Sequence, residues 1–208
     1  MPDPGRQWQL LDGLRNILLI TGDPTRIGDY PQARSVFDID SAGLIRAAAA
    51  MNGGKDLLGQ TIERRTSFLI GCALNATAAN IDAEIVRLER KAEAGAHIVF
   101  TQPIYEMRTL EVALRRIEPL RLPLMLGVLP LRGTKHAEFL HNEVPGMSIP
   151  DGIRTRLRKA GTNGAAAGVE IAVEFLRAAA PLVAGVYLMP PFRKYDMVPQ
   201  LLRGAGLR

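Results

Sequence analysis

Two polar residues, Asp23 and Gln102, stand at the ends of apolar segments. NILLIT (16–21) runs into Gly22-Asp23-Pro24, and HIVFTQ (97–102) ends in the glutamine itself. A carboxylate stabilises positive charge, and a neutral amide both donates and accepts hydrogen bonds. Glycine, aspartate and proline also favour ordinary turns, so Asp23 has a simpler interpretation as a turn former. We interpret both residues as site candidates because each lies at the end of a predicted strand.

The elements that would position these residues alternate along the chain. Short apolar segments predict strands at 16–21, 67–74, 97–102, 123–129 and 182–189. Amphipathic segments predict helices at 41–52, 82–95, 107–120, 134–141, 151–160, 165–179 and 195–203. In the second helix Ile85, Leu88 and Ala92 share one face, and Gly95 suits the C-terminal cap.

This alternation predicts an α/β fold with parallel strands and right-handed crossovers. It leaves two architectures open, an open five-stranded sheet and part of a closed eight-stranded barrel. In both of them ligands bind at the carboxyl ends of the strands. Polar residues and prolines follow the predicted strands at this edge, which is where Asp23 and Gln102 lie.

The amino-acid composition argues against several classes of protein. The 208 residues fit one domain or a piece of a larger one, and 47% of them are hydrophobic. The net charge of +5 is dispersed, with no nucleic-acid-binding motif, so no nucleic-acid partner is expected. The single cysteine, Cys72, excludes an internal disulfide and a multi-thiolate metal site, and its apolar surroundings are typical of a buried residue. Without a predicted membrane span or signal peptide, we expect a cytoplasmic protein that binds no membrane.

Five longer stretches carry a family resemblance. They are ITGDPTRIGDYP (20–31), VFDIDSAGLIR (36–46), ERKAEAGAHIVFTQP (89–103), GVLPLRGTKHAEFLHNEVPG (127–146) and GVYLMPPF (185–192). In this order they resemble the methylenetetrahydrofolate reductase family. The likeness is closest to the reductase half of bacterial bifunctional proteins that join it to a homocysteine S-methyltransferase.

The resemblance implies a (β/α)₈ TIM barrel with FAD at its C-terminal face. The predicted strands match the last five of the eight, so residues 1–208 are expected to form the C-terminal part of such a barrel, with no second domain. The first three strands and the family's catalytic glutamate would belong to a segment outside this chain. A complementing N-terminal segment or a homo-oligomer is therefore an expected partner, and no metal is expected.

The implied activity is the reduction of 5,10-methylenetetrahydrofolate to 5-methyltetrahydrofolate with NAD(P)H as co-substrate. Because a wall of the barrel would be missing together with the general acid, we expect the chain alone to bind FAD weakly at most and to reduce folate negligibly. Two alternatives stay open. One is a truncated, non-catalytic remnant or interaction module with weak FAD binding, and the other is an independent open-sheet binding protein.

The resemblance also assigns roles around the first strand end. Asp23 matches an aspartate that stabilises the cationic iminium form of the folate and tunes the reduced flavin, so it is the expected catalytic residue. Thr21 and Gly22 are expected beside the flavin, where a glycine lets the backbone approach closely. Tyr30 is expected to pack on the adenine or the flavin.

Further cofactor contacts are implied on the helix at 82–95. Arg90 and Lys91 match positions that contact the FAD phosphates or ribose, although ERK on an amphipathic helix is also typical of a solvated face. Glu84 and Arg87 align with flavin-contacting positions but differ in side-chain type from the family. Asn75 is a further cofactor candidate, followed by alanine where the family has proline.

Three residues are implied in substrate binding. Gln102 matches a glutamine that contacts folate and nicotinamide. His136 falls where the family has another folate-contacting polar residue, with an exposed helix histidine as the alternative. Arg193 is a candidate for the glutamate tail of the folate.

Overall fold

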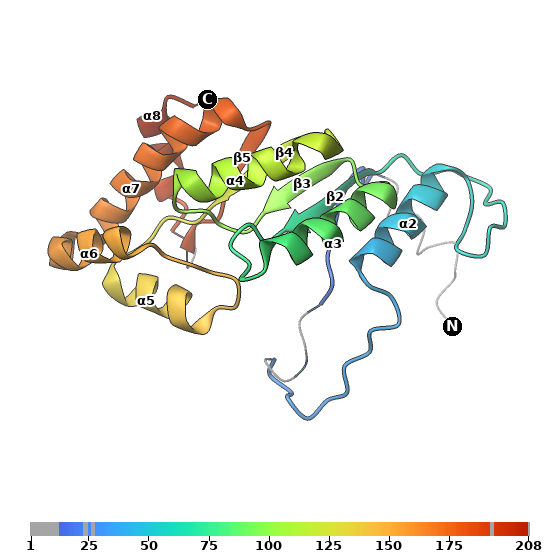
Figure 1. Ribbon diagram of the computed structural model, residues 1–208, viewed down its shortest axis with the longest axis horizontal. Helices are drawn as coiled ribbons and strands as arrows, with labels where there is room; N and C mark the ends of the chain where they lie inside the picture. The colour runs from blue at the N-terminus through green and yellow to red at the C-terminus, as the bar shows by residue number, and fades with distance from the viewer. Residues whose placement is uncertain (1–12, 23–24, 26–27, 192–193, 208) are drawn as a thin grey trace. The chain divides into compact units, whose positions relative to one another are not determined.

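The computed structural model describes residues 13–22, 25, 28–191 and 194–207, and strands alternate with helices along them (Figure 1). The strands of this part are β1 (Asn16–Leu19), β2 (Leu69–Leu74), β3 (Ile98–Thr101), β4 (Leu124–Val128) and β5 (Gly185–Leu188). The α-helices are α2 (Ser41–Asn52), α3 (Ile81–Glu93), α4 (Met107–Ile117), α5 (Thr134–Glu143), α6 (Asp151–Ala160), α7 (Gly164–Ala179) and α8 (Met197–Ala205). The described part also contains the short 3₁₀ helices η2 (Glu118–Leu120), η3 (Gly161–Asn163) and η4 (Ala180–Leu182).

Within the described residues the five strands form one sheet in the order β1-β2-β3-β4-β5. The pairs β1–β2, β3–β4 and β4–β5 are parallel; Asn16 lies beside Leu69, and Met125 beside Gly185. Parallel neighbours that follow one another in sequence need a covering connection, and the helices supply it. The predicted α/β fold with five parallel strands is confirmed, and it is consistent with an incomplete (β/α)₈ barrel.

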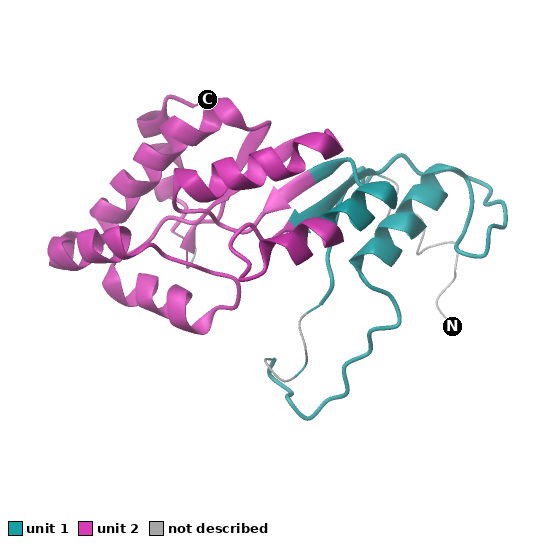
Figure 2. Ribbon diagram, in the orientation of Figure 1, with its two compact units in different colours: residues 1–73, 88–98 teal, residues 74–87, 99–208 magenta. Residues whose placement is uncertain are grey.

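The chain divides into two compact units (Figure 2). The first unit comprises residues 1–73 and 88–98, and the second comprises 74–87 and 99–208. Each is described by itself below.

In the first unit, hydrogen bonds from the Asn52 side chain hold the connection between α2 and β2. The Asn52 Nδ2 atom donates to the Phe68 carbonyl at 3.0 Å, and the Asn52 Oδ1 atom accepts from the Phe68 backbone N–H at 2.8 Å. The Thr66 hydroxyl donates to the same oxygen at 2.8 Å. Asn52 thus pairs with Phe68 as a neighbouring strand would, and it holds the chain just before β2 begins.

The end of α3 also lies in the first unit and follows the predicted cap. Gly95 has a φ of 109°, which favours glycine. Its N–H donates to the Ala92 carbonyl at 3.0 Å, and the N–H of Ala96 donates to the Lys91 carbonyl at 3.0 Å. These two bonds form a Schellman motif, so the predicted helix end at Gly95 is confirmed.

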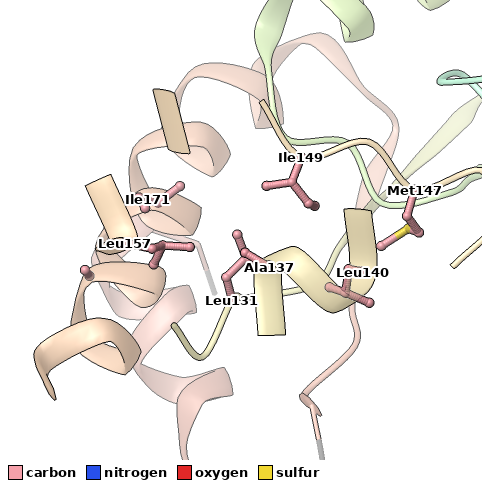
Figure 3. Packing of buried hydrophobic residues seen from close by; sticks show 8 residues of the cluster. Leu131, Ala137, Leu140, Met147, Ile149, Leu157 and Ile171 are labelled. Atoms are coloured by element: carbon pink, nitrogen blue, oxygen red, sulfur yellow. The ribbon is translucent and has the colours of Figure 1, made fainter. Parts of the chain in front are cut away.

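The second unit contains a cluster of buried apolar side chains that come from the chain after β4 and from α5, α6 and α7 (Figure 3). Two of its members, Met147 and Ile149, come from EVPGMSIP, which the sequence presents as a linker without helical or strand periodicity. This segment therefore contributes to the core. The cluster consists of Leu131, Ala137, Leu140, Met147, Ile149, Leu157, Ala167 and Ile171.

Helix α7 packs on this cluster through small residues. Gly168 lies so close to Leu131 that a Cβ atom there would approach the Leu131 carbonyl oxygen well inside 3.0 Å. Real Cβ atoms essentially never come that near. The backbone of α7 therefore rests directly on the backbone that follows β4.

The predicted boundaries differ from the observed ones by a few residues. The predicted strand 182–189 begins three residues too early, because Ala180–Leu182 form η4 and β5 begins at Gly185. Pro181 lies inside that turn and donates no backbone hydrogen bond to a strand ladder. The prediction for the first strand, 16–21, extends two residues too far, because β1 ends at Leu19.

Candidate functional site

The segment after β1 belongs to the first unit and carries Thr21, Gly22 and Tyr30. The Thr21 hydroxyl accepts from the Ser41 backbone N–H at 3.1 Å, which ties it to the first residue of α2. Gly22 is exposed, with no atom within 4 Å of the position of a Cβ. The Tyr30 side chain is 71% exposed, so its ring is accessible to a ligand. Asp23, the predicted catalytic residue, lies outside the described residues, and its role stays a prediction.

Two adjacent basic residues on α3, Arg90 and Lys91, differ in burial within the first unit. Lys91 is buried, and its Nζ atom donates to the Ala73 carbonyl at 2.7 Å. Arg90 is exposed. The solvated-face alternative is therefore wrong for Lys91, because the neighbouring strand needs a donor at that carbonyl. Arg90 does face solvent, as that alternative predicts, and its guanidinium is accessible to an anion.

Cys72 on β2 is the buried residue that its surroundings predicted. It is 0% exposed, and burial raises its pKa to about 11, with the nearby Lys91 charge opposing that rise. A thiol with this pKa stays protonated at neutral pH and is a poor nucleophile. Cys72 therefore has the properties of a core residue.

In the second unit, Asn75, Glu84 and Arg87 form one network at the end of β2. The buried Glu84 accepts the Asn75 backbone N–H through Oε1 at 3.1 Å. Its Oε2 atom accepts from the Arg87 guanidinium at 2.5 Å. The Glu84 carboxylate thus binds the first backbone N–H after β2 and pairs with Arg87, one turn further along α3. Both oxygens of Glu84 are used internally, and the Arg87 side chain is largely exposed beyond that pair.

The Asn75 side chain joins this network to the loop before α6. Its Oδ1 atom accepts from the Thr77 backbone N–H at 3.1 Å, and it lies 3.0 Å from the Thr77 hydroxyl. That hydroxyl has one proton and also lies 2.5 Å from the Gly146 carbonyl, so it donates to one of the two at a time. Gly146 has a φ of 78°, and a Cβ there would lie 2.5 Å from the Asn75 Nδ2 atom. Sequence reasoning did not select Thr77 or Gly146, and the only local signal was the glycine after Pro145.

Gln102 follows β3, and its exposed side chain is available to a ligand. Its backbone N–H donates to the Leu74 carbonyl at 2.9 Å, so Gln102 lies beside the residue that precedes Asn75. The residue before it, Thr101, is 1% exposed, and the Thr101 hydroxyl oxygen accepts from the Gly127 N–H at 3.0 Å. The end of β3 is therefore fixed by buried hydrogen bonds while the Gln102 side chain is not covered.

His136 lies on α5, half-buried, with Nδ1 accepting from the Arg132 backbone N–H at 3.2 Å. Burial, and then the nearby Arg132 charge, lower its pKa, so the imidazole is neutral at pH 7. A neutral imidazole that caps a turn differs from the exposed helix histidine of the alternative interpretation. Arg193 lies outside the described residues and stays a prediction.

The second unit thus brings Asn75, Glu84 and Arg87 together and places Gln102 next to them through Leu74. Among the described residues, no group of His, Cys, Asp and Glu side chains could hold a metal ion. No helix of the described part is long and apolar enough to cross a membrane.

Comparison with known protein families gives a match. The model of the family described as methylenetetrahydrofolate reductase matches residues 7–189. This confirms the resemblance at the level of the family. A comparison with individual curated proteins gives no significant match. The closer likeness to the bifunctional bacterial proteins is untested and stays a prediction.

Proposed function

Because the chain belongs to the methylenetetrahydrofolate reductase family, we propose that it takes part in the flavin-dependent reduction of 5,10-methylenetetrahydrofolate to 5-methyltetrahydrofolate. NAD(P)H would be the source of the hydride. The observation that carries the proposal is the family match over residues 7–189. The exposed Gln102, held on a rigid strand end, supports it.

The chemistry of the first-unit residues fits a flavin nucleotide. The exposed Arg90 guanidinium can pair with a phosphate oxygen, and the exposed Tyr30 ring offers an apolar face to an aromatic ring system. The open space at Gly22 permits close approach of the backbone. FAD would supply the relay that carries a hydride from the nicotinamide to the folate.

Lys91 and Glu84 fit a supporting role better than direct contact with the cofactor. The Lys91 ammonium already donates to the Ala73 carbonyl, and Glu84 already binds Asn75 and Arg87. We propose that Lys91 orients α3 against the end of β2, while Arg90 meets the phosphates.

At the folate, we propose distinct roles for Gln102 and Asp23. The Gln102 side chain would donate to and accept from the pterin edge, which presents both kinds of group. The Asp23 carboxylate would stabilise the positive charge of the iminium form that accepts the hydride. Neither role requires a proton to leave the residue.

Cofactor binding is tested by titrating the purified chain with FAD and following flavin fluorescence. Arg90→Met should weaken FAD binding by at least about tenfold, since charged hydrogen bonds contribute about 1.5–3 kcal/mol. Arg108→Met is the matched control, because Arg108 is an exposed arginine on α4 with no proposed role. Equal loss in both variants would indicate a general charge effect and contradict the assignment of Arg90.

The reaction is tested by stopped-flow measurement of the two half-reactions, with and without a segment that supplies the first three βα units of a family reductase. Asp23→Asn should slow the oxidation of the reduced flavin by methylenetetrahydrofolate more than it slows flavin reduction by NAD(P)H. Asp29→Asn, an exposed aspartate in the same loop, should change neither rate. If the wild-type chain binds neither FAD nor folate, whether or not this segment is present, the proposed function is wrong.

A further inference from the structure

The peptide group between Thr101 and Gln102 is held at both of its polar ends. Its N–H, which belongs to Gln102, donates to the Leu74 carbonyl at 2.9 Å. Its carbonyl, which belongs to Thr101, accepts from the Tyr187 hydroxyl at 2.5 Å. The first donor–acceptor pair is ordinary backbone, whereas the second depends on a side chain that lies 86 residues away in sequence.

Tyr187 reaches this carbonyl from β5 by passing over β4. Its neighbour on β4 is Gly127, and a Cβ atom there would lie 2.7 Å from the Tyr187 hydroxyl and 2.8 Å from the Thr101 carbonyl oxygen. The lack of a side chain at Gly127 therefore leaves the path open. The Phe100 ring meets the Tyr187 ring edge-on, with centroids 5.6 Å apart and planes at 66°. The tyrosine ring is thus positioned from the side as well as at its tip.

The Tyr187 hydroxyl keeps its proton at neutral pH, as an ordinary tyrosine does, and burial raises its pKa further. It therefore acts as a permanent donor to the Thr101 carbonyl. The second unit holds another tyrosine of the same kind: the Tyr105 hydroxyl donates to the Leu129 carbonyl at 3.0 Å. That bond is chemically equivalent but ends on a different peptide group.

We propose that Tyr187 is a positioning residue for Gln102: by holding the Thr101 carbonyl, it fixes the peptide plane from which the Gln102 side chain extends. The direction of a Cα–Cβ bond follows the orientation of the preceding peptide plane. A rotation of this plane would therefore turn the Gln102 side chain away from its ligand. The significance for folate rests on the proposed function, whereas the fixing of the peptide does not.

The first measurement concerns the peptide itself. Amide hydrogen exchange of Gln102, followed by NMR in the full chain, should accelerate about threefold to tenfold in Tyr187→Phe, the effect of losing one neutral hydrogen bond. The Val99 amide, which donates to the Pro123 carbonyl in the same strand, serves as the internal reference and should change little. Tyr105→Phe is the matched control and should leave the Gln102 amide unchanged. Equal acceleration at Val99 and Gln102, or none, would overturn the proposal.

The second measurement concerns the ligand. The Kd for 5-methyltetrahydrofolate, from equilibrium dialysis, should rise about threefold or more in Tyr187→Phe. In a Gln102→Ala background the same substitution should have no further effect, because Tyr187 acts through that side chain. Additive losses in the double variant would overturn the link to the ligand. If the wild-type chain binds no folate even with the segment that supplies the first three βα units, the proposed function fails, and the exchange data still decide whether Tyr187 holds the peptide.

A second variant covers the case in which Tyr187→Phe does not fold. Gly127→Ala keeps the tyrosine but places a methyl group 2.7 Å from its hydroxyl and 2.8 Å from the Thr101 carbonyl oxygen, so it drives the two bonded atoms apart. It should give the same selective acceleration at the Gln102 amide. If Gly127→Ala folds and leaves that amide as protected as in the wild type, the proposal is wrong.

Discussion

Substituting Gly168 by alanine should destabilise the second unit through a backbone contact. The added methyl group would lie well inside 3.0 Å of the Leu131 carbonyl oxygen, and neither the helix nor this carbonyl can move away as a flexible side chain would. Overpacking of this kind costs about 1–3 kcal/mol and sometimes more. Alanine in a helix gains about 0.5–1 kcal/mol over glycine. Because the clash is between backbones, we place the cost at the upper end and expect a net loss of about 2 kcal/mol.

Gly152→Ala supplies the matched control. Gly152 is exposed near the start of α6, and no atom lies within 4 Å of its Cβ position. Its substitution keeps the propensity gain without the clash, so it should be neutral or stabilising by up to about 1 kcal/mol.

The assay is urea unfolding followed by circular dichroism. With a slope of about 2 kcal/mol per molar urea, the midpoint should fall by about 1 M for Gly168→Ala and should not fall for Gly152→Ala. If Gly168→Ala is as stable as the wild type, α7 does not rest on the Leu131 backbone, and the packing described for the second unit is wrong.

Three further outcomes are expected. Cys72 should not react with a thiol reagent at about pH 8 in the native chain, because a pKa of about 11 leaves about one thousandth of it as thiolate, and one thiol per chain should appear after denaturation. The free energy of unfolding should fall more steeply with acid in the wild type than in His136→Gln. The lowered His136 pKa gives stability that is complete above its ordinary value of 6.5 and is lost as the pH falls through the folded-state value. Gly146→Ala should cost about 2 kcal/mol in urea unfolding, since it combines a positive φ with a 2.5 Å approach to the Asn75 Nδ2 atom, and a neutral result would contradict that arrangement.

Local sequence signals predicted the elements and several of their ends. The Gly95 cap could be predicted because a Schellman motif depends on one residue with positive φ just after the last apolar position. The parallel sheet followed from alternation alone. The strand at 182–189 was placed too early, because an apolar leucine beside Pro181 fits a strand pattern as well as it fits a turn.

The internal roles of candidate side chains could not be predicted in the same way. Glu84 and Lys91 lie on an amphipathic helix, where charged residues usually face solvent, yet each meets a backbone group at or next to the end of β2. Which carbonyl or N–H lacks a partner is decided by the packing of distant segments. The Tyr187–Thr101 hydrogen bond could not be predicted for the same reason, since it joins residues on β5 and β3. Such pairs leave no periodic trace in one sequence.

The Asn52 bonds have a practical consequence for protein engineering. Since both polar groups of the Phe68 backbone are bound by Asn52, the path of the chain into β2 does not depend on how long the preceding loop is. Extending a closed loop costs little, about 0.6 kcal/mol for each doubling of its length. Gly59, at an exposed turn with no atom within 4 Å of its Cβ position, is then a site for inserting a peptide tag or a fluorescent label, at the expense of the turn's own hydrogen bonds to Asp56. A probe placed there would report on the first unit without disturbing the strand to which the loop leads.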